Sequence, residues 1–174
     1  MTGPTRSALL DRLEALRLLW SGGAGSDDLF SDAVQLDTSH RGAEQGVAAA
    51  VGAFAPFEVP RIRMSNHVVR AVEGQAAASA YVCVEDHATR ITGLIVAQLS
   101  AAMRIETIGF QLAGVEGDAA RLGWNLPVTN RQWRPGDRPA AVLSELDAPW
   151  RRIPVSTLPL TDEEAIAEAW YRYA

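Results

Sequence analysis

Two turns of nearly the same sequence lie in the middle of this chain, and they predict long antiparallel strands. Residues 72–77 read Val-Glu-Gly-Gln-Ala-Ala, and residues 115–120 read Val-Glu-Gly-Asp-Ala-Ala. Glycine supplies the positive φ angle that a tight hairpin turn needs. With period-two hydrophobicity around the turns, we expect 66–72 to pair with 76–85 and 102–116 to pair with 119–133. Such long arms must twist and coil, which gives the sheet a concave face.

Helical patterns precede this sheet. Residues 6–20 place leucines on one face at spacings of three and four, with Thr5 as a plausible N-cap. Residues 41–54 also favour a helix, and residues 29–37 a short strand. The pattern predicts an α+β protein in which a curved antiparallel sheet wraps around N-terminal helices. Residues 87–100 receive no assignment.

Length and charge limit the partners. A chain of 174 residues makes one domain of ordinary size. Asp and Glu outnumber Lys and Arg by 21 to 16, for a net charge of −5, which disfavours nucleic acid as a partner. No stretch approaches the roughly 20 apolar residues of a spanning helix, so we expect no membrane partner. Cys83 is the single cysteine, which cannot form an internal disulfide and favours a cytoplasmic location.

The C-terminal quarter has a different character. Five prolines lie between Pro135 and Pro159, and they exclude a central strand. The sequence Thr-Asp-Glu-Glu at 161–164 is a capping box that predicts a closing helix with an apolar stripe. We therefore divide the chain into a cone domain over 1–137 and a proline-rich wrap with a C-terminal helix over 138–174. An isolated helix this short is marginal in water, so we expect it to pack on the same domain.

Several short sequence segments, in this order along the chain, resemble segments of a known family. They are Leu29-Phe-Ser-Asp-Ala33, Arg41-Gly42 before an apolar segment, Ser65-Asn-His-Val-Val-Arg-Ala-Val-Glu-Gly74, and residues 117–124. The chain resembles SnoaL-like proteins of the nuclear transport factor 2-like superfamily over roughly residues 8–134. The resemblance implies a cystatin-like cone with a pocket. The family includes dehydratases, isomerases, cyclases and hydrolases, and also members that only bind a ligand. The resemblance therefore implies one of these activities or ligand binding alone.

Two residues are candidates for catalysis. His67 lies in the first long strand, and an imidazole exchanges protons near neutral pH; the competing interpretation is a strand histidine that faces solvent. Asp32 follows Phe30 at the entry to the cone, where a carboxylate can also simply cap a turn. A dehydratase of this family would carry a histidine at the position of Ile62, so this chain departs from that pattern.

Five further residues are candidates for the pocket wall. Trp20, Tyr81 and Trp124 can stack on a ligand, although such aromatic residues more often fill a core. Arg104 and Glu106 share one strand face if alternation holds, together with Ile108. On the concave face they would form a buried ion pair that signals function, and on the convex face a surface pair or subunit contact.

These observations lead to one functional hypothesis and one alternative. The hypothesis is a protein that binds a small apolar or aromatic molecule without cofactor or metal, with weak lyase or isomerase activity left open. The alternative is a non-catalytic dimerisation or accessory domain. No pair of histidines has the spacing of a metal site.

We predict a homodimer formed through the convex sheet face, because a large exposed apolar surface is rare on a monomer. Light scattering at micromolar concentration should give about twice the chain mass of 18.7 kDa. A measured mass equal to that of one chain would contradict this prediction.

Overall fold

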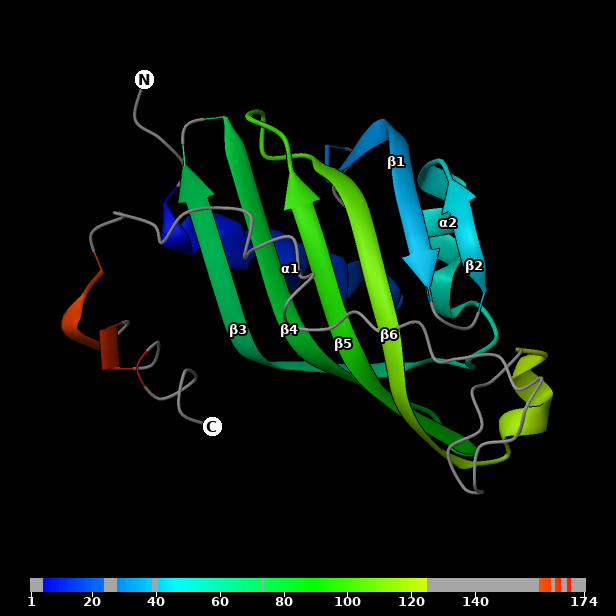
Figure 1. Ribbon diagram of the computed structural model, residues 1–174. Coiled ribbons are helices and arrows are strands. Elements are labelled where there is room, and N and C mark those ends of the chain that lie inside the picture. Colours follow the sequence, from blue (N-terminus) through cyan, green and yellow to red (C-terminus); the bar gives the residue numbers. More distant parts are fainter. Residues whose placement is uncertain are drawn as a thin grey trace, which may run out of the picture.

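A six-stranded curved sheet with helices on one face forms the body of the protein (Figure 1). The computed structural model describes residues 5–23, 28–38, 41–72, 74–124, 160–163, 165–166 and 169. The elements up to residue 122 are α1 Arg6–Trp20, β1 Phe30–Thr38, β2 Gly42–Gln45, α2 Val47–Val51, the 3-10 helix η1 Gly52–Phe54, β3 Arg61–Val72, β4 Gln75–Glu85, β5 Thr89–Leu99, β6 Ile105–Gly117 and the 3-10 helix η2 Ala119–Leu122.

The strand order is β2-β1-β6-β5-β4-β3. Neighbouring strands are antiparallel except for β1 and β6, which run parallel. The α+β curved sheet expected from the sequence is confirmed, and its one parallel pair makes it a mixed sheet.

The first helix forms as its sequence predicts. The Thr5 side-chain oxygen accepts a hydrogen bond from the Ala8 amide at 3.2 Å and caps the helix. Leu9, Leu13 and Leu16 are buried along one stripe, which packs α1 against β3 and β4. In Figure 1 this helix crosses behind those strands. We call the sheet face covered by α1 the inner face and the opposite one the outer face.

The first hairpin is confirmed, with one irregularity. β3 pairs antiparallel with β4 around Gly74, whose φ is 76°. The register shifts between Ser65 and Val68, where Asn66 has a φ of 52°. A bulge of this kind redirects side chains, and here it lies at His67.

The prediction of a second hairpin, in which 102–116 pairs with 119–133, is wrong. β6 pairs with β5, which occupies most of the stretch left unassigned, and the chain enters η2 after Gly117; residues 125–133 lie outside the described residues. A Cβ atom on Gly117 would collide with the Ala88 carbonyl oxygen, and the Asp118 amide donates to that oxygen at 3.0 Å. Gly117 therefore lets the backbone of β6 lie close to the β4–β5 turn, and it does not reverse the chain.

The helix expected over residues 41–54 is also wrong in its first part. Residues 42–45 form β2, which pairs with β1, and only Val47–Val51 is α-helical before η1. Gly42 and Gly46 have φ angles of 86° and 96°, outside the helical region. These two positive φ angles end any helix before Val47.

An aromatic cluster fills the space between the inner face and the helices. The Phe54 ring packs edge-on against Trp20 at 4.8 Å and Phe110 at 5.4 Å between centroids. Trp124 joins through Phe57 at 5.8 Å. The Trp20 indole donates to the Ala50 carbonyl at 2.9 Å, which satisfies its one polar atom. This part of the cone is thus a packed core.

The C-terminal helix begins where the capping box predicts, since the Ala165 amide donates to the Thr161 carbonyl at 2.9 Å. Ile166, one residue of the stripe expected to dock, is 71% exposed. Trp170, Tyr173 and the proline-rich residues 138–159 lie outside the described residues. Docking of this helix therefore stays a prediction. Within the described ranges, we find no helix whose length and hydropathy would let it span a bilayer.

Packing at Gly93 yields a stability prediction. A Cβ atom there would lie 2.6 Å from the Phe110 ring and collide with the Gln111 carbonyl oxygen. We expect Gly93→Ala to lower the free energy of unfolding by about 1–3 kcal/mol, because an overpacked core forces shifts. Urea unfolding followed by tryptophan fluorescence measures this change.

Gly52→Ala is the matched control. A Cβ atom on Gly52 meets nothing within 4 Å, and its φ of −81° suits alanine. We expect a change below about 1 kcal/mol for this variant. Equal stability of the two variants would contradict the close contact at Gly93.

Candidate functional site

A groove of about 820 Å³ lies on the outer face and runs over the edge strand β3 toward α1. Its lining includes the side chains of Glu14, Arg17, Arg63, His67, Tyr81 and Arg90. Ile62, Met64 and Val82 also border it, but they pack in or against the core. Residues from α1, β3, β4 and β5 thus meet in one hollow.

Strand periodicity builds the outer part of this groove. Arg63 pairs with Cys83, and Cys83 pairs with Thr92 across the next strand. Their neighbours in sequence, such as Ile62 and Val84, are buried in the core. Successive strand residues point to opposite faces, so the polar members point outward.

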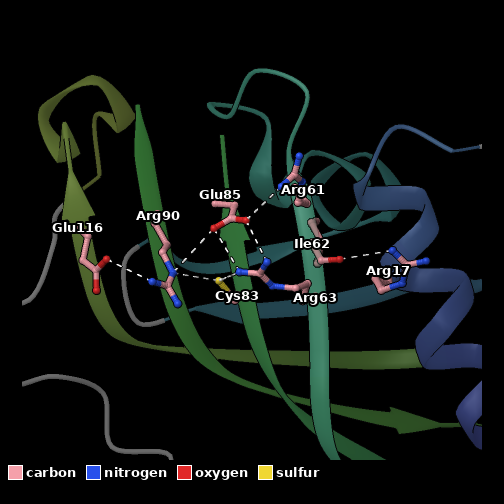
Figure 2. A network of polar contacts seen from close by, with 8 residues as sticks. All are labelled: Arg17, Arg61, Ile62, Arg63, Cys83, Glu85, Arg90 and Glu116. Carbon is pink, nitrogen blue, oxygen red and sulfur yellow. Dashed lines mark hydrogen bonds and ion pairs between the residues drawn. The ribbon is translucent and has the colours of Figure 1, made fainter. Parts of the chain in front are cut away.

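Three arginines surround one carboxylate beside the groove, as Figure 2 shows. The Glu85 carboxylate lies 3.2 Å from Arg63, 3.9 Å from Arg61 and 3.9 Å from Arg90. Arg90 also reaches Glu116 at 3.4 Å. We call Arg61, Arg63, Arg90, Glu85 and Glu116 the outer-face network.

Cys83 lies inside this network. Its sulfur accepts hydrogen bonds from Arg63 Nη2 at 3.5 Å and from Arg90 Nε at 3.3 Å. The bond to Cys83, together with Glu116 and Glu85, raises the pKa of Arg90, so that guanidinium stays charged. Two cationic groups therefore converge on one small side chain.

The other end of the groove is closed by α1. Arg17 binds the Glu14 carboxylate through two hydrogen bonds of 2.8 and 2.6 Å, which lower the pKa of Glu14 and raise that of Arg17. Arg17 also donates to the Ile62 carbonyl of β3 at 3.4 Å (Figure 2). This contact ties the helix to the edge strand.

His67 lies half-buried in the groove wall. Burial lowers its pKa below 6.5, Arg6 lowers it further, and Glu14 opposes both. The imidazole is therefore neutral at pH 7 and can accept a proton or a hydrogen bond.

The groove differs from the pocket that the sequence predicts inside the cone, although two of the candidate residues line it. His67 and Tyr81 both line the groove. Trp20 and Trp124 instead belong to the aromatic cluster in the core. Asp32 is exposed on β1, away from the residues that line the groove.

The expectation that Ile108 shares a strand face with Arg104 and Glu106 is wrong. Arg104 lies in the β5–β6 turn, where its amide donates to Ser100 Oγ at 3.2 Å. The pairing of β5 with β6 skips Glu106, since Leu99 pairs with Ile105 and Gln98 with Thr107. This bulge puts Ile105 on the inner face with Ile108, and both charged side chains are exposed.

The sequence interpretation missed the outer-face network. Arg61, Arg63, Cys83 and Glu85 follow a strict two-residue spacing that could have revealed it. Their common site also needs Arg90, which lay in the unassigned stretch. Strand partners far apart in sequence carry no local signal of their pairing.

The sequence interpretation also missed a second feature, which holds two parts of the structure together. The Asp86 carboxylate, 1% exposed, binds Arg121 of η2. It also accepts hydrogen bonds from the amides of Ala88 and Thr89, both at 2.9 Å. This residue fixes the β4–β5 turn and η2 together. Across the described part of the chain, no three His, Cys, Asp or Glu side chains gather closely enough to hold a metal ion.

Comparison with known proteins identifies the fold. No family model and no curated protein matches the sequence. Among solved structures, the chain is similar to the Kfla4162 protein from Kribbella flavida, with a TM-score of 0.58 and 14% identity over 68% of this chain and 96% of that one. It is also similar to a protein of unknown function with a cystatin-like fold from Nostoc punctiforme, with a TM-score of 0.50 and 12% identity over 62% of this chain and 90% of that one. The chain has the cystatin-like fold.

A third match agrees with this assignment. A cystatin-like protein of unknown function from Methylobium petroleophilum gives a TM-score of 0.50 and 12% identity, over 68% of this chain and 84% of that one. The resemblance to the nuclear transport factor 2-like superfamily is therefore supported at the level of the cystatin-like fold. At these identities the likeness says nothing of ligand or reaction.

We predict that His67 titrates below pH 6.5 in an NMR titration of its ring protons, because burial favours the neutral imidazole. Glu14→Gln should lower this pKa further, since the Glu14 carboxylate stabilises the imidazolium. Asp11→Asn, the same charge change at an exposed position on α1, is the control and should shift the pKa less.

The same pKa shift predicts a pH effect on stability. The folded pKa lies below the unfolded value, so the unfolded chain binds the proton more readily. The contribution of neutral His67 is full above about pH 6.5 and is lost as the pH falls toward the folded pKa. Relative to His67→Gln, the wild type should lose stability on acidification from pH 7. A difference that does not vary with pH would contradict the lowered pKa.

Proposed function

We propose that this protein binds a small organic molecule in the groove between α1 and the outer face of β3, β4 and β5. The groove volume of about 820 Å³ carries the proposal, because ligand sites usually measure about 300–1,000 Å³. Polar groups from four elements converge on it beside the exposed ring of Tyr81. A few placed polar groups next to an aromatic side chain are typical of ligand sites.

The exposed ring of Tyr81 supports a ligand with an aromatic or apolar part. Tyr81 is 53% exposed and lines the groove. A flat aromatic ring can stack on the phenol or contact its edge.

The proposal extends to weak, cofactor-independent lyase or isomerase chemistry through His67. Its half-buried, neutral imidazole beside Glu14 has the features of a proton acceptor. Asp32 has no place in this proposal, because it is exposed outside the groove. The single cysteine supports a cytoplasmic setting for such a protein.

A second candidate is a non-catalytic dimerisation or accessory domain. The aromatic cluster around Phe54 favours it, because side chains of the protein itself occupy that part of the cone. Tyr81 could then be a contact residue on the outer face. Light scattering combined with the ligand experiment separates the two candidates.

We predict that small neutral aromatic compounds such as phenol and indole shift the amide NMR signals of residues 65–67, 81–83 and 90–92. Thr92→Trp should abolish these shifts, because a large side chain there would fill the groove. Gln35→Trp, at an exposed strand position away from the groove, should leave them unchanged. Shifts centred on Trp20 and Phe54, or no shifts, would contradict the proposed site.

A further inference from the structure

We infer that the natural ligand of this groove is an organic acid whose carboxylate binds between Arg63 and Arg90. This inference rests on the proposed function and adds the chemical class of the ligand. It depends on three properties of the outer-face network: its charge, its geometry and its weak internal pairing.

The groove is locally positive on a protein that is negative overall. The outer-face network holds three arginines against two glutamates, while the chain carries a net charge of −5. Glu14 and Arg17 neutralise each other at the opposite end. Within the network, Arg63 and Arg90 line the groove, whereas Glu85 and Glu116 do not. The charge that a ligand meets there is therefore positive.

The geometry marks one point for an anion. Arg63 and Arg90 both donate to the Cys83 sulfur, at 3.5 and 3.3 Å, so N–H groups of both guanidiniums lie next to the same atom (Figure 2). A thiol sulfur is a weak acceptor, whereas a carboxylate offers two strong acceptor oxygens. An incoming carboxylate above Cys83 would meet donors from both sides.

The existing ion pairs leave these donors accessible. The side chains of Arg63 and Arg90 are 56% and 46% exposed, and one carboxylate, Glu85, is divided among three arginines. Surface ion pairs of this kind contribute little free energy. Rearranging them around a ligand therefore costs little.

The strand spacing sets the shape of the acid. Tyr81 lies two residues before Cys83 on the same face of β4. Alternate residues of a strand are about 7 Å apart, which is close to the length of a benzoate ion. A ligand whose carboxylate lies over Cys83 can thus place an aromatic ring against Tyr81.

Three probes that share one phenyl ring and differ in charge test this inference: benzoate, benzamide and benzylamine. We expect benzoate to bind about tenfold more tightly than neutral benzamide, since charge-assisted hydrogen bonds to arginine are strong. Cationic benzylamine should bind more weakly than either. Amide chemical-shift titrations give the three dissociation constants.

Arginine variants locate the anion. Arg63→Gln and Arg90→Gln should each weaken benzoate binding several-fold and weaken benzamide binding less, because only benzoate loses a charge-assisted hydrogen bond. Arg61→Gln is the matched control, because it removes the same charge from the same network at a position outside the groove wall. Melting curves of the three variants show whether each is folded.

The outcomes are distinct. If benzamide binds as tightly as benzoate, the acid inference is wrong while the groove remains a ligand site. If none of the three probes binds, the proposed function fails and this inference fails with it. If Arg61→Gln weakens benzoate as much as Arg63→Gln does, general electrostatic attraction explains the binding and the placement over Cys83 is wrong.

Discussion

The packing of Phe54 against Trp20 and Phe110 is the contact on which the rest of the structure depends. It joins α1, η1 and β6 across the inner face of the sheet, and Phe57 extends it to Trp124. A curved sheet with an apolar inner face must cover that face, and the aromatic rings pack against one another as part of that cover. As a consequence, this part of the cone acts as the hydrophobic core.

The described groove lies on the outer face and at the β3 edge. Near it, the side chains that alternate with core residues of β3, β4 and β5 include the polar and charged residues Arg63, Cys83 and Arg90. The groove therefore uses a surface that the core does not need. Substitutions in the outer-face network can therefore test the proposed ligand binding while the aromatic contacts stay intact. In this proposal, stability and recognition lie on opposite faces of the same strands.

Prediction from sequence succeeded where the pattern is local. The cap at Thr5, the leucine stripe of α1 and the hairpin at Gly74 all depend on residues a few positions apart. Prediction failed where a residue far away in the sequence determines the local structure. Gly74 and Gly117 have nearly the same neighbours in sequence, yet one reverses the chain and the other makes room for the Ala88 carbonyl. Of the residues predicted for a pocket inside the cone, His67 and Tyr81 line the groove on the outer face, and the sequence did not indicate that Arg63, Cys83 and Arg90 line it too.

The sequence by itself determined the fold class, the first helix and hairpin, and which strand residues alternate between apolar and polar. Tertiary structure alone decided that β6 pairs with β5 and β1, that a bulge at Glu106 returns Ile105 to the core, and that three arginines meet at Glu85. The physical reason is the range of the interactions. Helix caps and tight turns are set by neighbouring residues, whereas strand register and side-chain convergence are set by which distant segments pack together.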